Sequence, residues 1–171
     1  MIDWMPNGLV GHLLPRPRGL VNYSSVLDVG AGVRPIDWYA AELHLCVEPH
    51  APYAQRLLEN GYRVVQATAR DALRLVVPGT FEAIYMLDVI EHMERDEGLE
   101  VIQLMLAAQP KQIVIYTPNG FLEQNGPDPW GMGGESWQQH RSGWHPHDFE
   151  GWDISYFHRG FTALWTAPTA H

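Results

Sequence analysis

Two acids and a histidine follow directly on an apolar run of the sequence. Residues 81–87, FEAIYML, precede Asp88, and Glu91 and His92 come three and four positions later. One short helical turn would place these three side chains on the same side. Such a cluster suits either of two roles, because it can accept a proton from a reacting group or hold a divalent cation.

The same residues also fit a purely structural role. Asp88-Val89-Ile90-Glu91 matches a D-x-x-E capping box, in which two acids satisfy the backbone amides at the start of a helix. Such a cap stabilises a helix by about 1 kcal/mol, and His92 would then be an ordinary neighbour. The position of this segment in the predicted fold distinguishes between the two roles.

Apolar strands alternate with helix-like segments along the chain, which predicts a parallel sheet. Helices are expected from Pro35 through IDWYAAE, over 51–61 with Gly61 as the C-terminal cap, and over 70–76 and 96–109. Strands are expected at 25–29, 43–47, 62–67, 81–87, 112–116, 152–158 and 161–167, the last two joined by a turn at Arg159-Gly160. The predicted fold is therefore α/β: a Rossmann-like, doubly wound, seven-stranded, mostly parallel sheet with a C-terminal antiparallel hairpin.

Length and composition predict one domain over residues 1–171, with 1–24 as an N-terminal segment. Residues 117–151 are rich in Gly, Pro and Trp and are expected to form a lid or a wall of the substrate pocket, with Trp137 and Trp144 beside the acceptor. Eleven basic and twenty acidic residues give a net charge of −9, which argues against general nucleic-acid binding. No membrane segment or signal peptide is expected, and the single cysteine favours the cytoplasm.

The first expected strand ends in a glycine bend. In VLDVGAG, Gly30 and Gly32 let the backbone approach a ligand closely, and Glu48 ends the next strand where it can accept hydrogen bonds from two ribose hydroxyls. This pair of features indicates a cofactor that contains adenosine, either NAD or S-adenosylmethionine. Pro35 interrupts the full G-x-G-x-x-G pattern, and the chain has no room for a separate substrate domain.

With these features the chain resembles the class I S-adenosylmethionine-dependent methyltransferases from about Val26 to the final hairpin. The resemblance implies that Asp28 meets the methionine amino group and that Pro49 lies against the adenine. It leaves open whether Ala69 or Asp71 faces the adenine amine, and whether the missing third glycine means a different turn or an arginine over the cofactor. The cofactor-binding residues that it implies are Asp28, Gly30, Ala31, Gly32, Glu48, Pro49, Ala69, Asp71 and Leu87.

A second, local resemblance concerns the acid–histidine cluster. The D-x-x-E-H element, TPN at 117–119 and a later H-x-x-x-W resemble the small-RNA 2′-O-methyltransferases, and ubiquinone-pathway O-methyltransferases carry a similar element. The resemblance implies Asp88, Glu91, His92 and His140 as catalytic residues. In the small-RNA family two acids and two histidines hold a magnesium ion, and the matching positions are Asp88, Glu91, His92 and His140. Both families have Glu in place of Asp88, so the metal ligands expected here are Glu91, His92 and His140.

The sequence as a whole predicts an S-adenosylmethionine-dependent methyltransferase that acts on a small molecule, with oxygen the preferred acceptor atom. An NAD-dependent oxidoreductase and a non-catalytic S-adenosylmethionine-binding module are the alternatives. The acceptor molecule and the oligomeric state are not encoded in any recognisable pattern.

Overall fold

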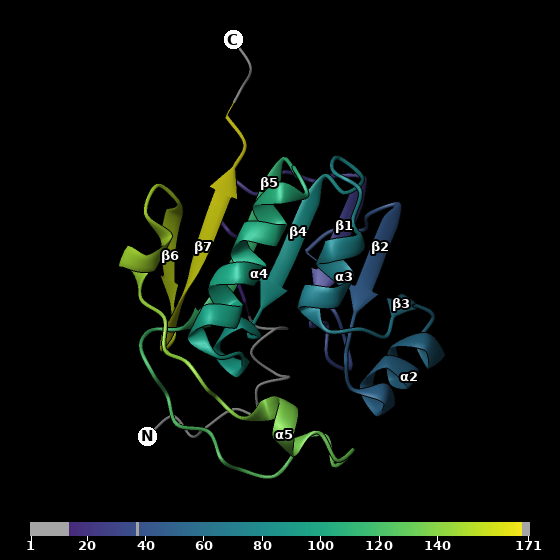
Figure 1. Cartoon of the computed structure of the whole chain (residues 1–171). Coiled ribbons are helices and arrows are strands. Elements are labelled where there is room, and N and C mark those ends of the chain that lie inside the picture. The colour runs from purple at the N-terminus through teal and green to yellow at the C-terminus, as the bar shows by residue number, and fades with distance from the viewer. Residues whose placement is uncertain (1–13, 37, 169–171) are drawn as a thin grey trace.

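A seven-stranded sheet forms the centre of the computed structural model, which describes residues 14–36 and 38–168 (Figure 1). Its order is β3-β2-β1-β4-β5-β7-β6; β1 to β5 are parallel, and β7 is antiparallel to both of its neighbours. The predicted fold class is confirmed. The strands are β1 (Ser25–Val29), β2 (Leu43–Val47), β3 (Arg63–Val65), β4 (Ala83–Leu87), β5 (Gln112–Pro118), β6 (Asp153–Phe157) and β7 (Gly160–Thr166).

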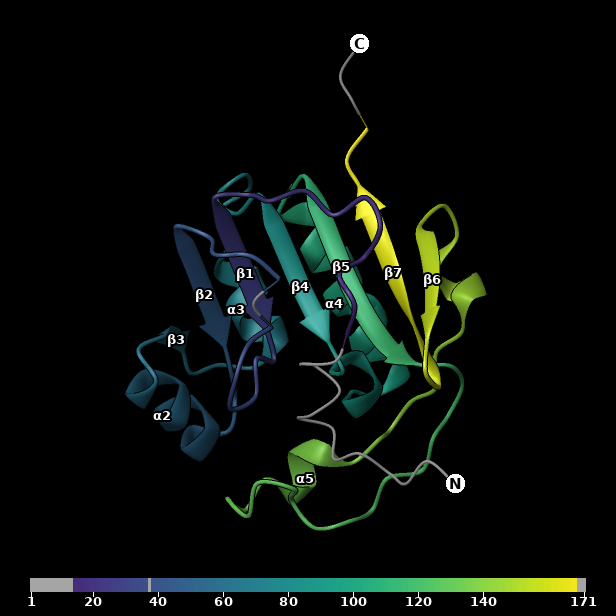
Figure 2. The same cartoon turned by 180° about the vertical axis from the view of Figure 1, so that it is seen from behind.

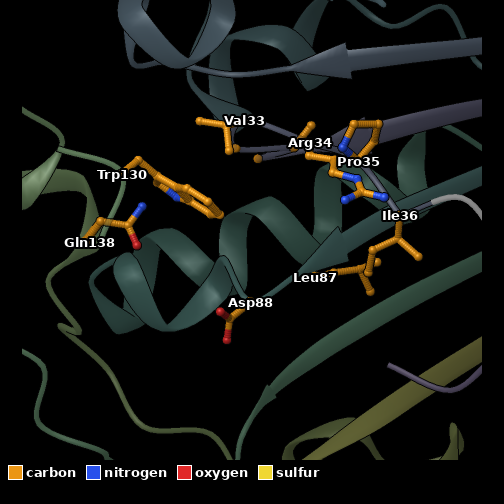
Figure 3. A pocket seen from close by; sticks show the side chains of 11 residues that line it. Val33, Arg34, Pro35, Ile36, Leu87, Asp88, Trp130 and Gln138 are labelled. Carbon is orange, nitrogen blue, oxygen red and sulfur yellow. The ribbon is translucent and has the colours of Figure 1, made fainter. Parts of the chain in front are cut away.

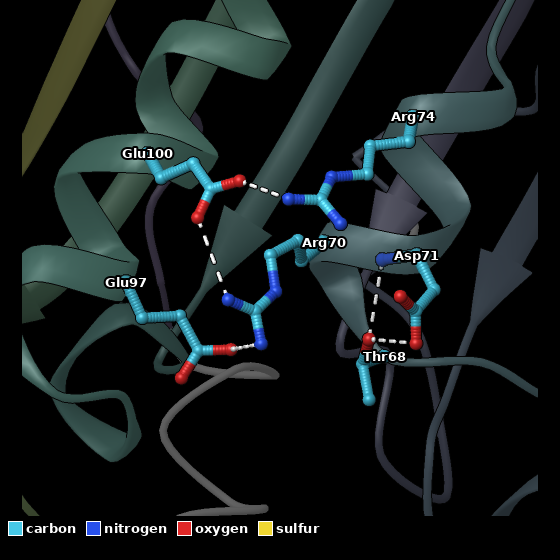
Figure 4. A network of polar contacts seen from close by, with 6 residues as sticks. All are labelled: Thr68, Arg70, Asp71, Arg74, Glu97 and Glu100. Carbon is cyan, nitrogen blue, oxygen red and sulfur yellow. Dashed lines mark hydrogen bonds and ion pairs between the residues drawn. The ribbon is translucent and has the colours of Figure 1, made fainter.

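One face of the sheet is covered by α3 (Ala69–Leu75) and α4 (Arg95–Ala107), close to the predicted ranges (Figure 1). Leu27, Ile84 and Ile113 are fully buried beneath them. At the surface the two helices are joined by ion pairs of Arg70 and Arg74 with Glu97 and Glu100 (Figure 4). Exposed pairs of this kind contribute little stability, so the apolar layer holds this face together.

On the opposite face, the described residues between β1 and β2 form no helix, so the helix predicted from Pro35 is wrong (Figure 2). Residues 33–36 and 38–42 form irregular chain, and Asp37 lies outside the described residues. Trp38 packs edge-on against Tyr85, and the Tyr39 hydroxyl is 2.9 Å from the Tyr85 hydroxyl. The side chains of Trp38 and Tyr39 both pack against the apolar cluster on this face of the sheet, and the irregular chain allows both contacts.

Residues 14–24 complete the cover of this face without forming a helix or strand, and the rest of the N-terminal segment predicted at 1–24 lies outside the described residues. Leu20 packs there against Val26 and Val114. At the β3 end, α2 (Ala51–Glu59) buries Leu57 against Cys46. The predicted end of α2 is confirmed, because Asn60 is its C-cap and Gly61 follows with a φ of 86°.

The segment after β5 crosses below the carboxyl ends of the parallel strands in Figure 1. It contains the short helix α5 (Glu135–Gln138) and the 3-10 turn η2 (Pro146–Phe149). Trp144 is fully buried and packs against Gly98 of α4, so its predicted place in the acceptor-pocket wall is wrong. The tight turn of the final hairpin is His158-Arg159, one residue earlier than predicted, because Phe157 pairs with Gly160.

Within the described part of the chain, no helix combines the length and the apolar character needed to cross a bilayer.

Candidate active site

The glycine bend after β1 is held in a conformation that needs glycine. Gly30 and Gly32 have φ values of 74° and 62°, and a Cβ on Gly30 would come within 2.5 Å of the Val89 side chain. The amides of Gly30 and Ala31 both donate to the Val47 carbonyl, at 2.7 and 3.2 Å. The bend is thereby fixed against the end of β2.

Glu48 is buried at the end of β2 and closes over this bend. One carboxylate oxygen accepts from the Gly32 amide and the other from the His50 amide, both at 2.9 Å. Burial raises the pKa of Glu48 to about 7, although the two amides act in the opposite direction. Each oxygen keeps lone-pair capacity for a further donor, such as a ribose hydroxyl.

Asp28 lies on the sheet face opposite α3 and α4. Its carboxylate is 3.0 Å from Nε2 of His44, on the neighbouring strand, and is almost fully buried. The predicted contact with the methionine amino group stays a prediction. The structure gives Asp28 a partner within the sheet and leaves it out of the hollow described below.

The other predicted cofactor residues lie on the same edge of the sheet. Pro49 directly precedes α2, Leu87 ends β4, and Ala69 is buried at the start of α3. Asp71 instead contacts Thr68, the N-cap of α3: the Thr68 hydroxyl accepts from the Asp71 amide at 3.2 Å and donates to the Asp71 carboxylate at 2.8 Å (Figure 4). That bond occupies one Asp71 oxygen in fixing the helix start.

The capping-box interpretation of Asp88 and Glu91 is wrong. Asp88 adopts a left-handed conformation, with a φ of 62°, and the 3-10 turn η1 (Ile90–His92) begins after Val89 without a side-chain cap. Glu91 is buried and Asp88 is half-buried, and their carboxyl groups contact each other. In the described part of the chain, Asp88 Oδ2 and Glu91 Oε1 have no hydrogen-bond donor.

The pKa values of these two acids therefore differ from those expected for a helix cap at the surface. Burial raises the pKa of Glu91 well above its usual range, and the neighbouring Asp88 raises it further; burial also raises the pKa of Asp88. The second Glu91 oxygen accepts from the Thr117 hydroxyl at 3.1 Å. The close Asp88 carboxyl thus favours the protonated form of Glu91.

Two histidines lie beside this pair. The rings of His92 and His140 are 4.9 Å apart, and ligand atoms of Glu91, His92 and His140 lie within 4.8 Å of one another. Nδ1 of His92 is 3.2 Å from the Gln139 carbonyl, and Nδ1 of His140 is 2.6 Å from the Leu122 carbonyl. A carbonyl only accepts, so in each neutral ring the proton is on Nδ1.

Burial keeps both rings neutral near pH 7. It lowers the pKa of His92 to about 4, with His140 adding to the effect, and it lowers the pKa of His140 as well. Neutral imidazoles oriented by backbone carbonyls are suited to accept a proton or to bind a metal. The structure thus brings together Asp88, Glu91, His92 and His140, which the sequence predicted as one cluster.

A hollow separates the glycine bend from this cluster (Figure 3). Arg34, Pro35 and Ile36 line one side, Trp130 and Gln138 the opposite side, and Leu87 and Asp88 lie between them (Figure 3). The remaining lining residues are Gly30, Ala31, Gly32 and Val33. The hollow lies where ligands bind in open α/β sheets, outside the carboxyl ends of the strands.

Trp130 reaches the hollow through a set of contacts that the sequence analysis missed. Asp128 accepts from the Tyr53 hydroxyl and from the amides of Trp130, Met132 and Gly134. These bonds attach the Trp130 loop to α2. The signal was the GPDPWGMGG segment, in which an acid stands among residues that expose backbone amides.

His140 is positioned by a second set of contacts. Arg141 and Ser142 donate their amides to the Glu91 carbonyl, at 2.7 and 3.1 Å. Arg95 of α4 lies over the Trp144 ring and pairs with Asp148. The part of the long segment that carries His140 is thereby fixed to α4 and η1.

Comparison with solved structures establishes the fold. A SAM-dependent methyltransferase from Archaeoglobus fulgidus superposes with a TM-score of 0.62 at 13% identity, over 83% of this chain and 85% of that one. Magnesium protoporphyrin IX methyltransferase from Synechocystis PCC 6803, with bound SAM, superposes with a TM-score of 0.56 at 12% sequence identity, over 82% of this chain and 68% of that one. The small RNA methyltransferase HEN1 superposes with a TM-score of 0.60 at 15% sequence identity, over 88% of this chain and 25% of that one.

The chain therefore has the Rossmann-like fold of S-adenosylmethionine-dependent methyltransferases. The sequence matches no protein-family profile and no curated protein.

Proposed function

We propose that the protein is an S-adenosylmethionine-dependent methyltransferase that methylates an oxygen of a small molecule. One observation carries the proposal: a hollow on this fold has the Gly30–Gly32 bend on one side and the half-buried acid of Asp88 on the other. A cofactor bound along the bend would direct its methyl group toward the acid–histidine cluster. A cytoplasmic location belongs to the proposal and rests on the single cysteine.

The bend side supplies the groups that an adenosyl cofactor needs. Glu48 is fixed by two amides in an orientation that leaves lone pairs for the ribose hydroxyls. Pro49 and Ala69 would lie toward the adenine, and Leu87 and the backbone of Gly30 toward the methionine part. Asp71 is the weaker candidate for the adenine, because the Thr68 hydroxyl already engages it.

Methyl transfer from a sulfonium requires alignment of the nucleophile with the methyl group and exclusion of water. A hydroxyl nucleophile also has to lose its proton. Neutral His92 and His140, with Nε2 as the acceptor nitrogen, can take that proton. Asp88 and Glu91 next to them would stabilise the imidazolium that forms.

The residues present also fit a divalent cation. Glu91, His92 and His140 supply three ligand atoms within 4.8 Å of one another, and the buried Glu91 Oε1 has no donor among the described residues. We include this as part of the proposal. When bound, such a cation lowers the pKa of a coordinated hydroxyl.

The acceptor is proposed to be small because the protein is acidic. The net charge is −9, and an RNA acceptor would need clustered Lys and Arg along its path. The structural neighbours include methyltransferases that are named for a porphyrin and for small RNA. The charge favours the first kind.

Two measurements test this function. Calorimetry should show that S-adenosylhomocysteine binds and that NAD does not, which separates the proposal from an oxidoreductase. Mass spectrometry should then show conversion of S-adenosylmethionine to S-adenosylhomocysteine in the presence of small hydroxylated acceptors. Binding of NAD alone would contradict the proposal, and binding without any conversion over a broad acceptor panel would favour a non-catalytic module.

A further inference from the structure

We propose that Arg34 binds the α-carboxylate of the adenosyl cofactor and is the main source of positive charge for it. The inference rests on the proposed function and names a residue that the glycine motif does not specify. Arg34 is exposed and is the one basic residue among the eleven that line the hollow. It directly precedes Pro35, in the part of the motif where the third glycine is missing.

The usual donors for an anion at such a bend are already engaged. Amides of Gly30 and Ala31 donate to the Val47 carbonyl, and the Gly32 amide donates to Glu48. A carboxylate in the hollow therefore cannot use these three N–H groups without breaking bonds that hold the bend.

The second usual source of positive potential is absent as well. In this fold a helix normally starts after the bend and directs its N-terminal amides at the ligand. Here the described residues 33–36 and 38–42 form no helix. The carboxylate of a bound cofactor would thus meet neither a free amide of Gly30, Ala31 or Gly32 nor a helix N-terminus formed by the described residues.

Arg34 is placed to replace both. It lies beside Pro35 and Ile36, across the hollow from Trp130 (Figure 3). Among the described residues its guanidinium forms no hydrogen bond or ion pair, so it does not pair with Asp88 in the same hollow. A guanidinium matches a carboxylate with two parallel N–H donors.

The test compares two ligands that differ only in the carboxylate: S-adenosylhomocysteine and its decarboxylated form. Calorimetry on the wild-type protein should show that S-adenosylhomocysteine binds about tenfold to a hundredfold more tightly. In Arg34→Gln this preference should fall to about threefold or less, through loss of affinity for S-adenosylhomocysteine alone. Arg34→Lys should retain part of it.

Arg63→Gln is the matched control, because Arg63 is an exposed arginine on β3 that lies outside the hollow, and it should keep the wild-type preference. An unchanged preference in Arg34→Gln would overturn the role of Arg34 and leave the proposed function standing. A wild-type protein that binds neither ligand would overturn both. Thermal unfolding of each variant confirms that the fold is intact.

Discussion

The acids on the two sides of the hollow differ in their hydrogen bonding. On the glycine-bend side, Glu48 has both oxygens on backbone amides, and Asp28 is paired with His44. On the β4 side, Asp88 and Glu91 each bury an oxygen that no donor of the described residues reaches. The described residues supply hydrogen-bond donors to the acids on the bend side, but not to one oxygen of each acid on the β4 side.

This difference indicates where the chemistry takes place. A buried acceptor without a donor costs about 1–3 kcal/mol, so an acid that contributes only to stability would be paired, as Glu48 is. Asp88 and Glu91 instead contact each other beside a histidine pair, and each keeps one oxygen that has no donor among the described residues. We infer that the bend side holds the cofactor and that the β4 side carries out the proton transfer.

The largest expected effect is on turnover. His92→Ala and His140→Ala should each lower kcat about 100-fold or more, because a positioned proton acceptor contributes about 10²- to 10⁴-fold. Affinity for S-adenosylhomocysteine should stay the same, since neither ring lies on the bend. His147→Ala, which changes an exposed histidine of the same segment, is the control. Full activity in both variants would assign the cluster a structural role.

A smaller effect is expected from Glu48→Ala. Loss of the ribose acceptor should weaken S-adenosylhomocysteine binding about tenfold to a hundredfold, as measured by calorimetry, because hydrogen bonds to a charged group contribute about 1.5–3 kcal/mol. The substitution also leaves the Gly32 and His50 amides without their acceptor. Glu59→Ala, at an exposed acid on α2, should bind normally, and an unchanged affinity in Glu48→Ala would refute the placement of the ribose.

Asp88→Asn should stabilise the protein while it impairs catalysis. Asn tolerates the left-handed φ of Asp88, and its amide can donate to Glu91. Because the folded pKa of Asp88 is raised, its contribution to stability is present below about pH 4 and is lost as the pH rises. The variant should therefore be more stable than wild type by about 1–2 kcal/mol at pH 7.

Urea unfolding at pH 4 and pH 7 measures this gain, which should shrink at the lower pH. Asp153→Asn, at an exposed site on β6, should show no gain at either pH. A variant that is less stable than wild type at pH 7 would show that the acid pair is favourable in the fold.

The smallest expected effect is a proton released on binding. The pKa of Glu48 is about 7 in the free protein, and ribose hydroxyls that donate to the carboxylate would lower it. Binding at pH 7 should thus release about half a proton, and affinity should rise between pH 6 and pH 8. Calorimetry in buffers of different ionisation enthalpy detects this release. Glu48→Gln should abolish it; the same buffer dependence in that variant would assign the proton elsewhere.

The strands and the acid–histidine cluster were predictable because their signals are local. Apolar runs that end at Val29, Glu48 and Asp88 mark strand ends, and the carboxyl ends of parallel strands meet at one edge. That His140 lies near His92 was predicted only from the family resemblance. His92 contacts Gln139, the residue before His140, across 47 residues of sequence, and no local signal predicts such a contact.

Other features depend on distant packing and were missed. Trp38 and Tyr39 sit in a helix-like sequence, but contacts with Tyr85 hold them in irregular chain. The sequence places Trp144 in a glycine-rich loop beside the acceptor, whereas in the structure its side chain packs against Gly98 of α4. The hydrogen bond from the Tyr53 hydroxyl to Asp128 spans 75 residues, and no local pattern predicts such a contact.

A crystal structure with bound S-adenosylhomocysteine tests the central claim most directly. We expect the ribose on Glu48, the amino-acid end between the Gly30–Gly32 bend and Arg34, and the sulfur facing Asp88. A ligand bound elsewhere, or one whose sulfur points away from the acid–histidine cluster, would contradict the account.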